Sequence, residues 1–285
     1  MRLGITTNCF ATAIASGEID LAGILEFAGE EGFLAAEIRD AAGDIPLDEL
    51  DAVVEDAASR EMALSYAVNN DCLIPGDRDT LTGAVIRAAA CGEGTVARIL
   101  ASQSVLAEKS RKGYTAAETD RIVMALRDYA DIAAEKGIVL ALEHAGEPLY
   151  GDGDSFFGLH DIIVALEATG GMPSSLALTF DPANAVFTAL CKAPVGPEKV
   201  FEFLGKHSHY IAMVHYKTTS SGELSPVIAD ADIDNERLFE ELSAVYDGVL
   251  CLEVPAAETL DECRSNVLTS LEYMRKNGLM GYLAQ

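Results

Sequence analysis

Residues 138–144 of the chain are Ile-Val-Leu-Ala-Leu-Glu-His, a short apolar run that ends in a carboxylate. The same pattern, an apolar run and then a side chain able to bind a metal, recurs in Thr-Phe-Asp181-Pro182, Met-Val-His215-Tyr216 and Cys-Leu-Glu253-Val254. The successive gaps, from Glu143 to Asp181, from Asp181 to His215 and from His215 to Glu253, are 38, 34 and 38 residues, the length of one strand and one helix in a repeating βα fold. Because the strands of a parallel barrel all point one way, we expect these side chains to converge at one mouth.

Eight strand-like runs occur along the chain, and helical patterns lie between them. The runs are nearly continuous in apolar residues, which is typical of strands covered on both faces. The 285 residues suit one barrel, and no linker or shift in composition divides them. We therefore expect an α/β fold, a (β/α)8 TIM barrel, as one domain over residues 1–285. The predicted strands are Leu3–Thr6, Ala35–Ile38, Ala63–Tyr66, Val96–Leu100, Ile138–Leu142, Leu176–Phe180, Ile211–Val214 and Val249–Leu252.

Two helix starts carry a capping box. Thr115-Ala-Ala-Glu118 and Thr259-Leu-Asp-Glu262 both place a threonine three residues before a glutamate. In this motif the two side chains satisfy each other's free backbone amides at the first turn of a helix. The sequence therefore predicts helices that begin near residues 116 and 260.

The charge of the chain restricts its partners. Lys and Arg total 20 against 46 Asp and Glu, a formal net charge of −26. Such a charge opposes binding to DNA, RNA or an anionic membrane and favours a small-molecule substrate. The apolar stretches are too short to span a bilayer, and the first residues lack the pattern of a signal peptide. We expect a cytoplasmic protein without nucleic-acid or membrane partners, while homo-oligomerisation stays open.

The four strand-end side chains form a candidate metal site. Three carboxylates and one imidazole brought together at a barrel mouth would repel one another unless a cation lay among them. Oxygen-rich ligation with one histidine nitrogen suits Mn²⁺, Mg²⁺, Co²⁺ or Zn²⁺. We therefore predict one divalent ion bound by Glu143, Asp181, His215 and Glu253.

These segments resemble the xylose-isomerase-like TIM-barrel family, which contains sugar isomerases, ketose 3-epimerases, inosose-processing enzymes and apurinic endonucleases. The resemblance covers nearly the whole chain. It implies that the four predicted ligands correspond to the metal set of the epimerase branch, and that Glu143 and Glu253 are also the catalytic acid/base pair. His215-Tyr-Lys217 is similar to the His-x-Lys of strand seven in this family, which implies that Lys217 lies beside substrate oxygens.

The chain also departs from the family pattern. Asn184, in Asp181-Pro-Ala-Asn184, stands where many members carry histidine; it can donate a hydrogen bond to a substrate hydroxyl but cannot act as an acid at neutral pH. Thr218 replaces a common aspartate, and no arginine follows within a few residues. These departures argue against a ketohexose 3-epimerase. The endonuclease branch needs a histidine-rich trinuclear zinc cluster, whereas this chain has five histidines and none before His144.

Other side chains near the predicted mouth have open roles. Glu37 either contacts a substrate hydroxyl or pairs with Arg39. Lys217 has the same strand parity as His215 and should face the same side, unless it is a solvated surface lysine. His144 should point away from Glu143 and pack behind the barrel. By position alone, Tyr66, Asn69 and Gln103 also lie near the mouth.

The combined pattern predicts an isomerase or epimerase that acts on a sugar or keto-polyol. A hydroxyl and a neighbouring carbonyl would chelate the ion, and a carboxylate would remove the proton between them to form an enediolate. Return of the proton to the opposite face inverts the centre, and return to the neighbouring carbon gives an aldose–ketose isomer. Two alternatives remain: a metal-dependent dehydratase or lyase acting on a keto-polyol, and a non-catalytic sugar-binding barrel.

Overall fold

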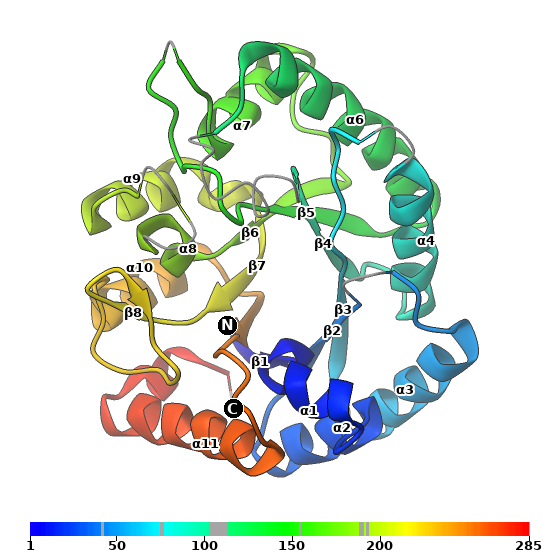
Figure 1. Cartoon of the computed structure of the whole chain (residues 1–285), viewed down its shortest axis with the longest axis vertical. Coiled ribbons are helices and arrows are strands. Elements are labelled where there is room, and N and C mark those ends of the chain that lie inside the picture. Colours follow the sequence, from blue (N-terminus) through cyan, green and yellow to red (C-terminus); the bar gives the residue numbers. More distant parts are fainter. Residues whose placement is uncertain are drawn as a thin grey trace.

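The computed structural model describes residues 1–40, 43–74, 77–102, 113–153, 155–187, 191 and 194–284. Eight parallel strands form a closed barrel in the order β1, β10, β7, β6, β5, β4, β3 and β2 (Figure 1). The predicted TIM barrel is therefore confirmed, and each predicted strand is present to within two residues at either end. The strands are β1 (Arg2–Thr6), β2 (Ala35–Arg39), β3 (Ala63–Ala67), β4 (Val96–Leu100), β5 (Val139–Glu143), β6 (Leu176–Phe180), β7 (Ile211–Tyr216) and β10 (Val249–Leu252).

Helices connect the strands and surround the barrel (Figure 1). Thr115 and Thr259 cap α6 and α11 through the predicted capping boxes, and both helices begin where the motifs indicate. None of the helices in the described part of the chain is long and apolar enough to cross a membrane. The helices that follow the eight strands are α2 (Leu21–Glu30), α3 (Leu47–Ser59), α4 (Asp77–Ala90), α6 (Ala116–Glu135), α7 (Leu159–Ala168), α9 (Pro197–His207), α10 (Asn235–Val245) and α11 (Leu260–Lys276).

Shorter elements lie at the loops. The helices α1 (Ala11–Ser16) and α8 (Pro182–Val186) follow β1 and β6, and a small hairpin of β8 (Thr219–Ser220) and β9 (Glu223–Leu224) follows β7. Its turn uses Ser221 and Gly222, both at positive φ, as in the tight turns that fit the twist of a hairpin. The 3-10 turns are η1 (Thr7–Phe10), η2 (Ser208–Tyr210) and η3 (Leu279–Tyr282).

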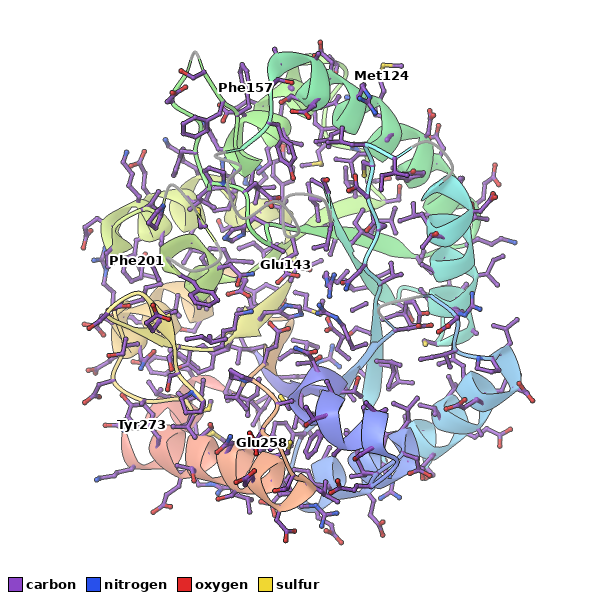
Figure 2. All side chains as sticks on the ribbon, in the orientation of Figure 1. Met124, Glu143, Phe157, Phe201, Glu258 and Tyr273 are labelled. Atoms are coloured by element: carbon purple, nitrogen blue, oxygen red, sulfur yellow. The ribbon has the colours of Figure 1, made fainter. Side chains whose placement is uncertain are left out.

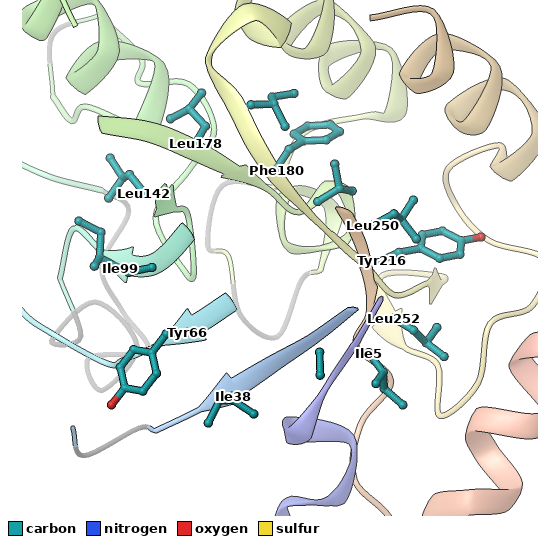
Figure 3. Packing of buried hydrophobic residues seen from close by; sticks show 14 of the residues in the cluster. Ile5, Ile38, Tyr66, Ile99, Leu142, Leu178, Phe180, Tyr216, Leu250 and Leu252 are labelled. Atoms are coloured by element: carbon teal, nitrogen blue, oxygen red, sulfur yellow. The ribbon is translucent and has the colours of Figure 1, made fainter. Parts of the chain in front are cut away.

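The two faces of the barrel wall carry different side chains. Because successive residues of a strand point to opposite faces, alternate apolar residues form one outer layer that packs against the helices. Figure 3 shows this layer, and its members are almost fully buried; they include Ile5, Ile38, Ile99, Leu142, Leu178, Leu250 and Leu252. The intervening residues face the barrel interior, where the chemistry-bearing side chains lie.

The amino-terminal end of the barrel is apolar and partly open. The described register between β3 and β4 consists of the pairs Tyr66–Ala97 and Ala67–Arg98, so the two strands are not paired at their amino-terminal ends. A cavity of about 410 Å³ lies at that end, and its lining includes Ala35, Ala63 and Val249. The predicted functional residues lie at the opposite, carboxyl-terminal end of the same strands.

Candidate active site

The four predicted ligands come together inside the carboxyl-terminal end of the barrel. One ligand atom from each of Glu143, Asp181, His215 and Glu253 lies within 4.8 Å of the others, and all four residues are buried. Figure 2 shows Glu143 near the middle of the barrel. The convergence expected from the strand-end spacing is therefore present, since the parallel register carries these side chains to one layer.

His215 is clamped among three carboxylates. Its Nε2 lies 2.8 Å from Oε2 of Glu37, and its Nδ1 lies 2.9 Å from Oε1 of Glu143 and 3.4 Å from Oε2 of Glu253. Burial opposes a charged ring, but Glu37, Glu253 and Glu143 raise the pKa of His215 well above its ordinary value. The clamp fixes which ring nitrogen faces the other ligands.

Glu37 pairs with His215, whereas Arg39 pairs with Glu253. Its Oε2 contacts His215, and its Oε1 accepts a hydrogen bond of 3.1 Å from the Thr6 hydroxyl. Both oxygens are therefore engaged, and the residue is fully buried. Despite burial, His215 lowers the pKa of Glu37. The position of Glu37 suits orientation of His215 better than contact with a substrate.

Lys217 faces the interior, as its parity with His215 indicates. Its ammonium nitrogen lies 2.6 Å from Oδ2 of Asp181 and 2.7 Å from Oε2 of Glu253. Burial works against the charge, but Asp181 and Glu253 raise the pKa of Lys217. Against the cost of burial, Lys217 and then His215 lower the pKa of Glu253 to about 2. Burial raises the pKa of Asp181 to about 6, although Lys217 pulls it down.

Asn184 lies beside the ligands at the start of α8. Asp181 caps this short helix, because its side chain accepts a hydrogen bond of 3.1 Å from the Asn184 amide. The Asn184 side-chain amide donates to the carbonyl of His144 at 3.0 Å and to Oε1 of Glu143 at 3.4 Å. Within the described part of the chain, its Oδ1 has no hydrogen-bond partner. That oxygen is free to accept from a substrate hydroxyl.

Arg98 is a site residue that the sequence reasoning missed. It projects from the middle of β4 into the barrel, is fully buried, and places Nε 3.2 Å from Oε2 of Glu143. Its Nη1 donates to the carbonyl of Val68 and to Oδ1 of Asn69, at 2.9 and 3.1 Å. A charged residue between apolar neighbours in Val-Ala-Arg-Ile-Leu was a visible signal, because a buried charge requires partners.

Glu147 is a second missed residue. It lies in the loop after β5, is buried, and accepts a hydrogen bond of 3.0 Å from the amide of Ala145 through Oε2. Its Oε1 has no partner among the described residues. Burial raises the pKa of Glu147 to about 7, with a smaller contribution from Glu143. A carboxyl group in this state can donate or accept a proton near neutral pH.

The remaining candidates have distinct places. His144 is fully buried and is absent from the four-residue cluster, and burial lowers the pKa of its ring to about 4. Asn69 contacts both Arg98 and Arg39 at the mouth. Tyr66 instead has the outward parity on β3, and its hydroxyl donates to Asp40. Gln103 lies outside the described residues.

The donor set fits a divalent cation. Three carboxylates and an imidazole nitrogen are suitable ligands, and the second ring nitrogen of His215 is held by a carboxylate, as is usual for metal-binding histidines. Lys217 contacts two of the same carboxylates, so it competes for them. An incoming ion would have to share or displace that ammonium.

Comparisons with known proteins identify the fold family. The model of the family described as xylose isomerase-like TIM barrel matches residues 25–277. No curated protein matches the chain in sequence. A solved D-psicose 3-epimerase from Clostridium cellulolyticum H10, with D-tagatose, is similar at a TM-score of 0.70 and 13% identity, covering 97% of this chain and 99% of that one.

Two further solved structures are similar over most of their length. An L-ribulose 3-epimerase has a TM-score of 0.69 and 16% identity, covering 99% of this chain and 95% of that chain. A xylose isomerase-like TIM barrel protein from Mycobacterium smegmatis, in complex with magnesium, has a TM-score of 0.62 and 18% identity, covering 94% of this chain and 91% of that chain. At these identities the likeness establishes the fold.

Proposed function

We propose, from the premise that the chain belongs to the xylose isomerase-like TIM barrel family, that it is a divalent-metal-dependent isomerase or epimerase of a sugar or keto-polyol. One observation carries the proposal: Glu143, Asp181, His215 and Glu253 converge within 4.8 Å at the carboxyl-terminal end of the barrel. Barrel enzymes place their active sites at this end. The epimerases among the similar structures, and the magnesium complex, are consistent with that chemistry.

The proposed ligands are Glu143, Asp181, His215 and Glu253, with Mn²⁺, Mg²⁺, Co²⁺ or Zn²⁺ as the ion. Glu37 and Thr6 would hold His215 in the orientation that turns Nδ1 toward the other ligands. A divalent ion bound there would polarise the substrate carbonyl and stabilise the negative charge that develops on its oxygen.

Glu143 and Glu253 would carry the proton transfers. They extend from β5 and from the end of β10, which are separated in the barrel by β6 and β7. Carboxylates on two sides of a bound substrate can remove a proton from one face of a carbon and return it to the other, which inverts the centre. Lys217 and Asn184 would bind substrate oxygens, since an ammonium donates hydrogen bonds and the Asn184 Oδ1 can accept one.

The test combines metal analysis with isotope exchange. Protein reconstituted with Mn²⁺ should hold one ion per chain at these four residues, as located by anomalous scattering. In deuterated water the loaded enzyme should place deuterium on the carbon beside the carbonyl of a ketose or keto-polyol. A product lighter by one water would support a dehydratase instead. Metal bound elsewhere, or no exchange with any substrate in a panel of neutral and anionic ketoses and inososes, would reject the proposal.

A further inference from the structure

Two arginines approach each other on the β2–β4 side of the mouth. Arg39 ends β2 and donates through Nη2 to Oδ1 of Asn69 at 3.4 Å, and Arg98 donates to the same oxygen at 3.1 Å. Two guanidinium groups therefore share one neutral amide oxygen. Burial, and to a smaller extent the charge of Arg39, lowers the pKa of Arg98. Two cations this close need a negative charge near them.

The carboxylates that face these arginines are the proposed metal ligands. Arg98 Nε lies 3.2 Å from Oε2 of Glu143, and Arg39 Nη1 lies 3.5 Å from Oε1 of Glu253. Nε of Arg98 is thus paired with Glu143, whereas its Nη2 has no hydrogen-bond partner within the described part of the chain. A fully buried guanidinium nitrogen without a partner is costly, because it loses water without gaining equivalent bonds.

The charges of the site also indicate an anionic ligand. Glu37, Glu143, Asp181 and Glu253 supply four negative charges, while Arg39, Arg98, Lys217 and a protonated His215 supply four positive ones. The protein's own side chains thus balance the centre. A divalent ion bound among the four ligands would add positive charge to this centre, which an anionic substrate would offset.

We propose that the substrate carries an oxyanion group, a carboxylate or a phosphate, that binds between Arg39 and Arg98 beside Asn69. This inference rests on the proposed function and specifies its substrate class. Guanidinium groups recognise both kinds of oxyanion through N–H donors, and Nη2 of Arg98, which has no partner among the described residues, supplies such donors. Arg39 supplies the second cation from the rim, where 21% of its side chain is exposed.

The experiment compares ketoses that differ in charge at one end. D-Fructose, D-fructose 6-phosphate and D-fructuronate share a ketose framework but end in a hydroxymethyl group, a phosphate ester and a carboxylate. D-Fructuronate is D-fructose with C6 oxidised to a carboxylate, so it is matched to D-fructose in configuration at C5. Solvent deuterium incorporation by the Mn²⁺-loaded enzyme gives kcat/KM for each. We expect an anionic ketose to exceed fructose by at least tenfold, since a hydrogen bond to a charged group contributes about 1.5–3 kcal/mol. The better anion distinguishes phosphate from carboxylate.

Arg39→Met is the decisive variant, because its partly exposed side chain can be removed without emptying the core as Arg98→Met would. It should lower kcat/KM for the preferred anionic ketose at least tenfold more than for fructose, because any effect through the contact of Arg39 with Glu253 acts on both substrates. Arg60→Met is the control. Arg60 is also partly exposed, but it pairs with Asp56 at the end of α3, far from the mouth. Its loss should change kcat/KM for neither the anionic ketose nor fructose. Equal effects of Arg39→Met on anionic and neutral ketoses would overturn the inference.

Direct binding separates this inference from the proposed function. Calorimetric titration of the Mn²⁺-loaded protein with D-gluconate, inorganic phosphate and neutral sorbitol reports the anion site without turnover. If Arg39→Met weakens anion binding but no ketose exchanges deuterium, the oxyanion site is supported and the proposed isomerase or epimerase activity is rejected. If fructose exchanges deuterium as fast as the anionic ketoses, the proposed enzyme activity is supported and the oxyanion site is rejected.

Discussion

The two ends of the barrel are built from the same strands in different ways. On β2 the inward positions run from Ala35 through Glu37 to Arg39, so a small apolar residue gives way to charged ones along a single strand. At the amino-terminal end, small side chains leave a cavity of about 410 Å³. At the carboxyl-terminal end, the interior is filled by carboxylates and cations that contact one another.

Because of this difference, substitutions at the two ends of the barrel should have different effects. A buried charge is tolerated only while its partners remain, so loss of one group at the carboxyl-terminal end leaves another uncompensated. An apolar residue beside a cavity has neighbours that can adjust, and its replacement should change only packing. Substitutions at the carboxyl-terminal end should therefore affect metal binding and turnover as well as stability, whereas those at the amino-terminal end should affect stability alone.

The largest effect is expected from Glu253→Gln and Glu143→Gln. Glutamine keeps the size and one oxygen ligand but cannot act as a base, so turnover should fall about 10²-fold or more. Each variant should keep a substantial fraction of its metal, as measured by elemental analysis beside the exchange assay. Undiminished turnover in metal-loaded Glu253→Gln would remove that residue from the mechanism and leave it as a ligand.

Glu37→Gln should act on metal affinity. Because Glu37 holds the Nε2 side of His215 and makes no other contact toward the ligands, its loss should weaken metal binding by about 10- to 100-fold. Calorimetric titration with Mn²⁺ measures this change. Glu18→Gln is a matched control, since that exposed carboxylate lies outside the barrel and bonds to Ser16. Unchanged affinity in Glu37→Gln would show that His215 does not depend on this partner.

Lys217→Met should have opposite effects on the metal-free and metal-loaded protein. Without the ammonium, Asp181 and Glu253 lose their shared partner, and the metal-free protein should lose about 3–5 kcal/mol of stability. The same change removes a competitor for two ligands, so Mn²⁺ should bind more tightly, by roughly tenfold or 1.4 kcal/mol. Lys199→Met, at a lysine side chain that is 57% exposed, should change neither quantity. Weaker metal binding in Lys217→Met would contradict the competition.

Glu147→Gln tests the pH dependence of the mouth. Burial raises the pKa of Glu147 from 4.5 to about 7, so the folded protein favours its neutral form. The stabilisation that neutral Glu147 contributes to the folded protein is therefore complete below pH 4.5. It declines as the pH rises to 7, by roughly 3 kcal/mol in total. Urea unfolding at pH 5 and pH 8 should therefore show a smaller decline in the variant than in the natural protein. An identical decline in both would place the titration in another group.

The sequence predicted much of this molecule because strand parity and βα spacing are local properties. The eight strands, both capping boxes and the convergence of Glu143, Asp181, His215 and Glu253 follow from those patterns. The clamp of Glu37 on His215 joins residues 178 positions apart, and no local pattern contains that pairing. The burial of Glu147 depends on the path of the loop after β5, and the composition of that loop does not determine its path.

The smallest effect on function is expected from Ala63→Val, at the amino-terminal end. Ala63 lines the cavity of about 410 Å³, so the two added methyl groups can bury apolar surface without displacing neighbours. Valine also suits a strand, and each buried carbon contributes about 0.8 kcal/mol, so the variant should gain up to about 1.5 kcal/mol. Urea unfolding measures the gain, and the exchange assay should find turnover within twofold of the natural protein. A loss of stability would mean that the cavity cannot accept the side chain. A change in turnover at unchanged stability would show that the charged end responds to packing at the apolar end, which would break the separation between them.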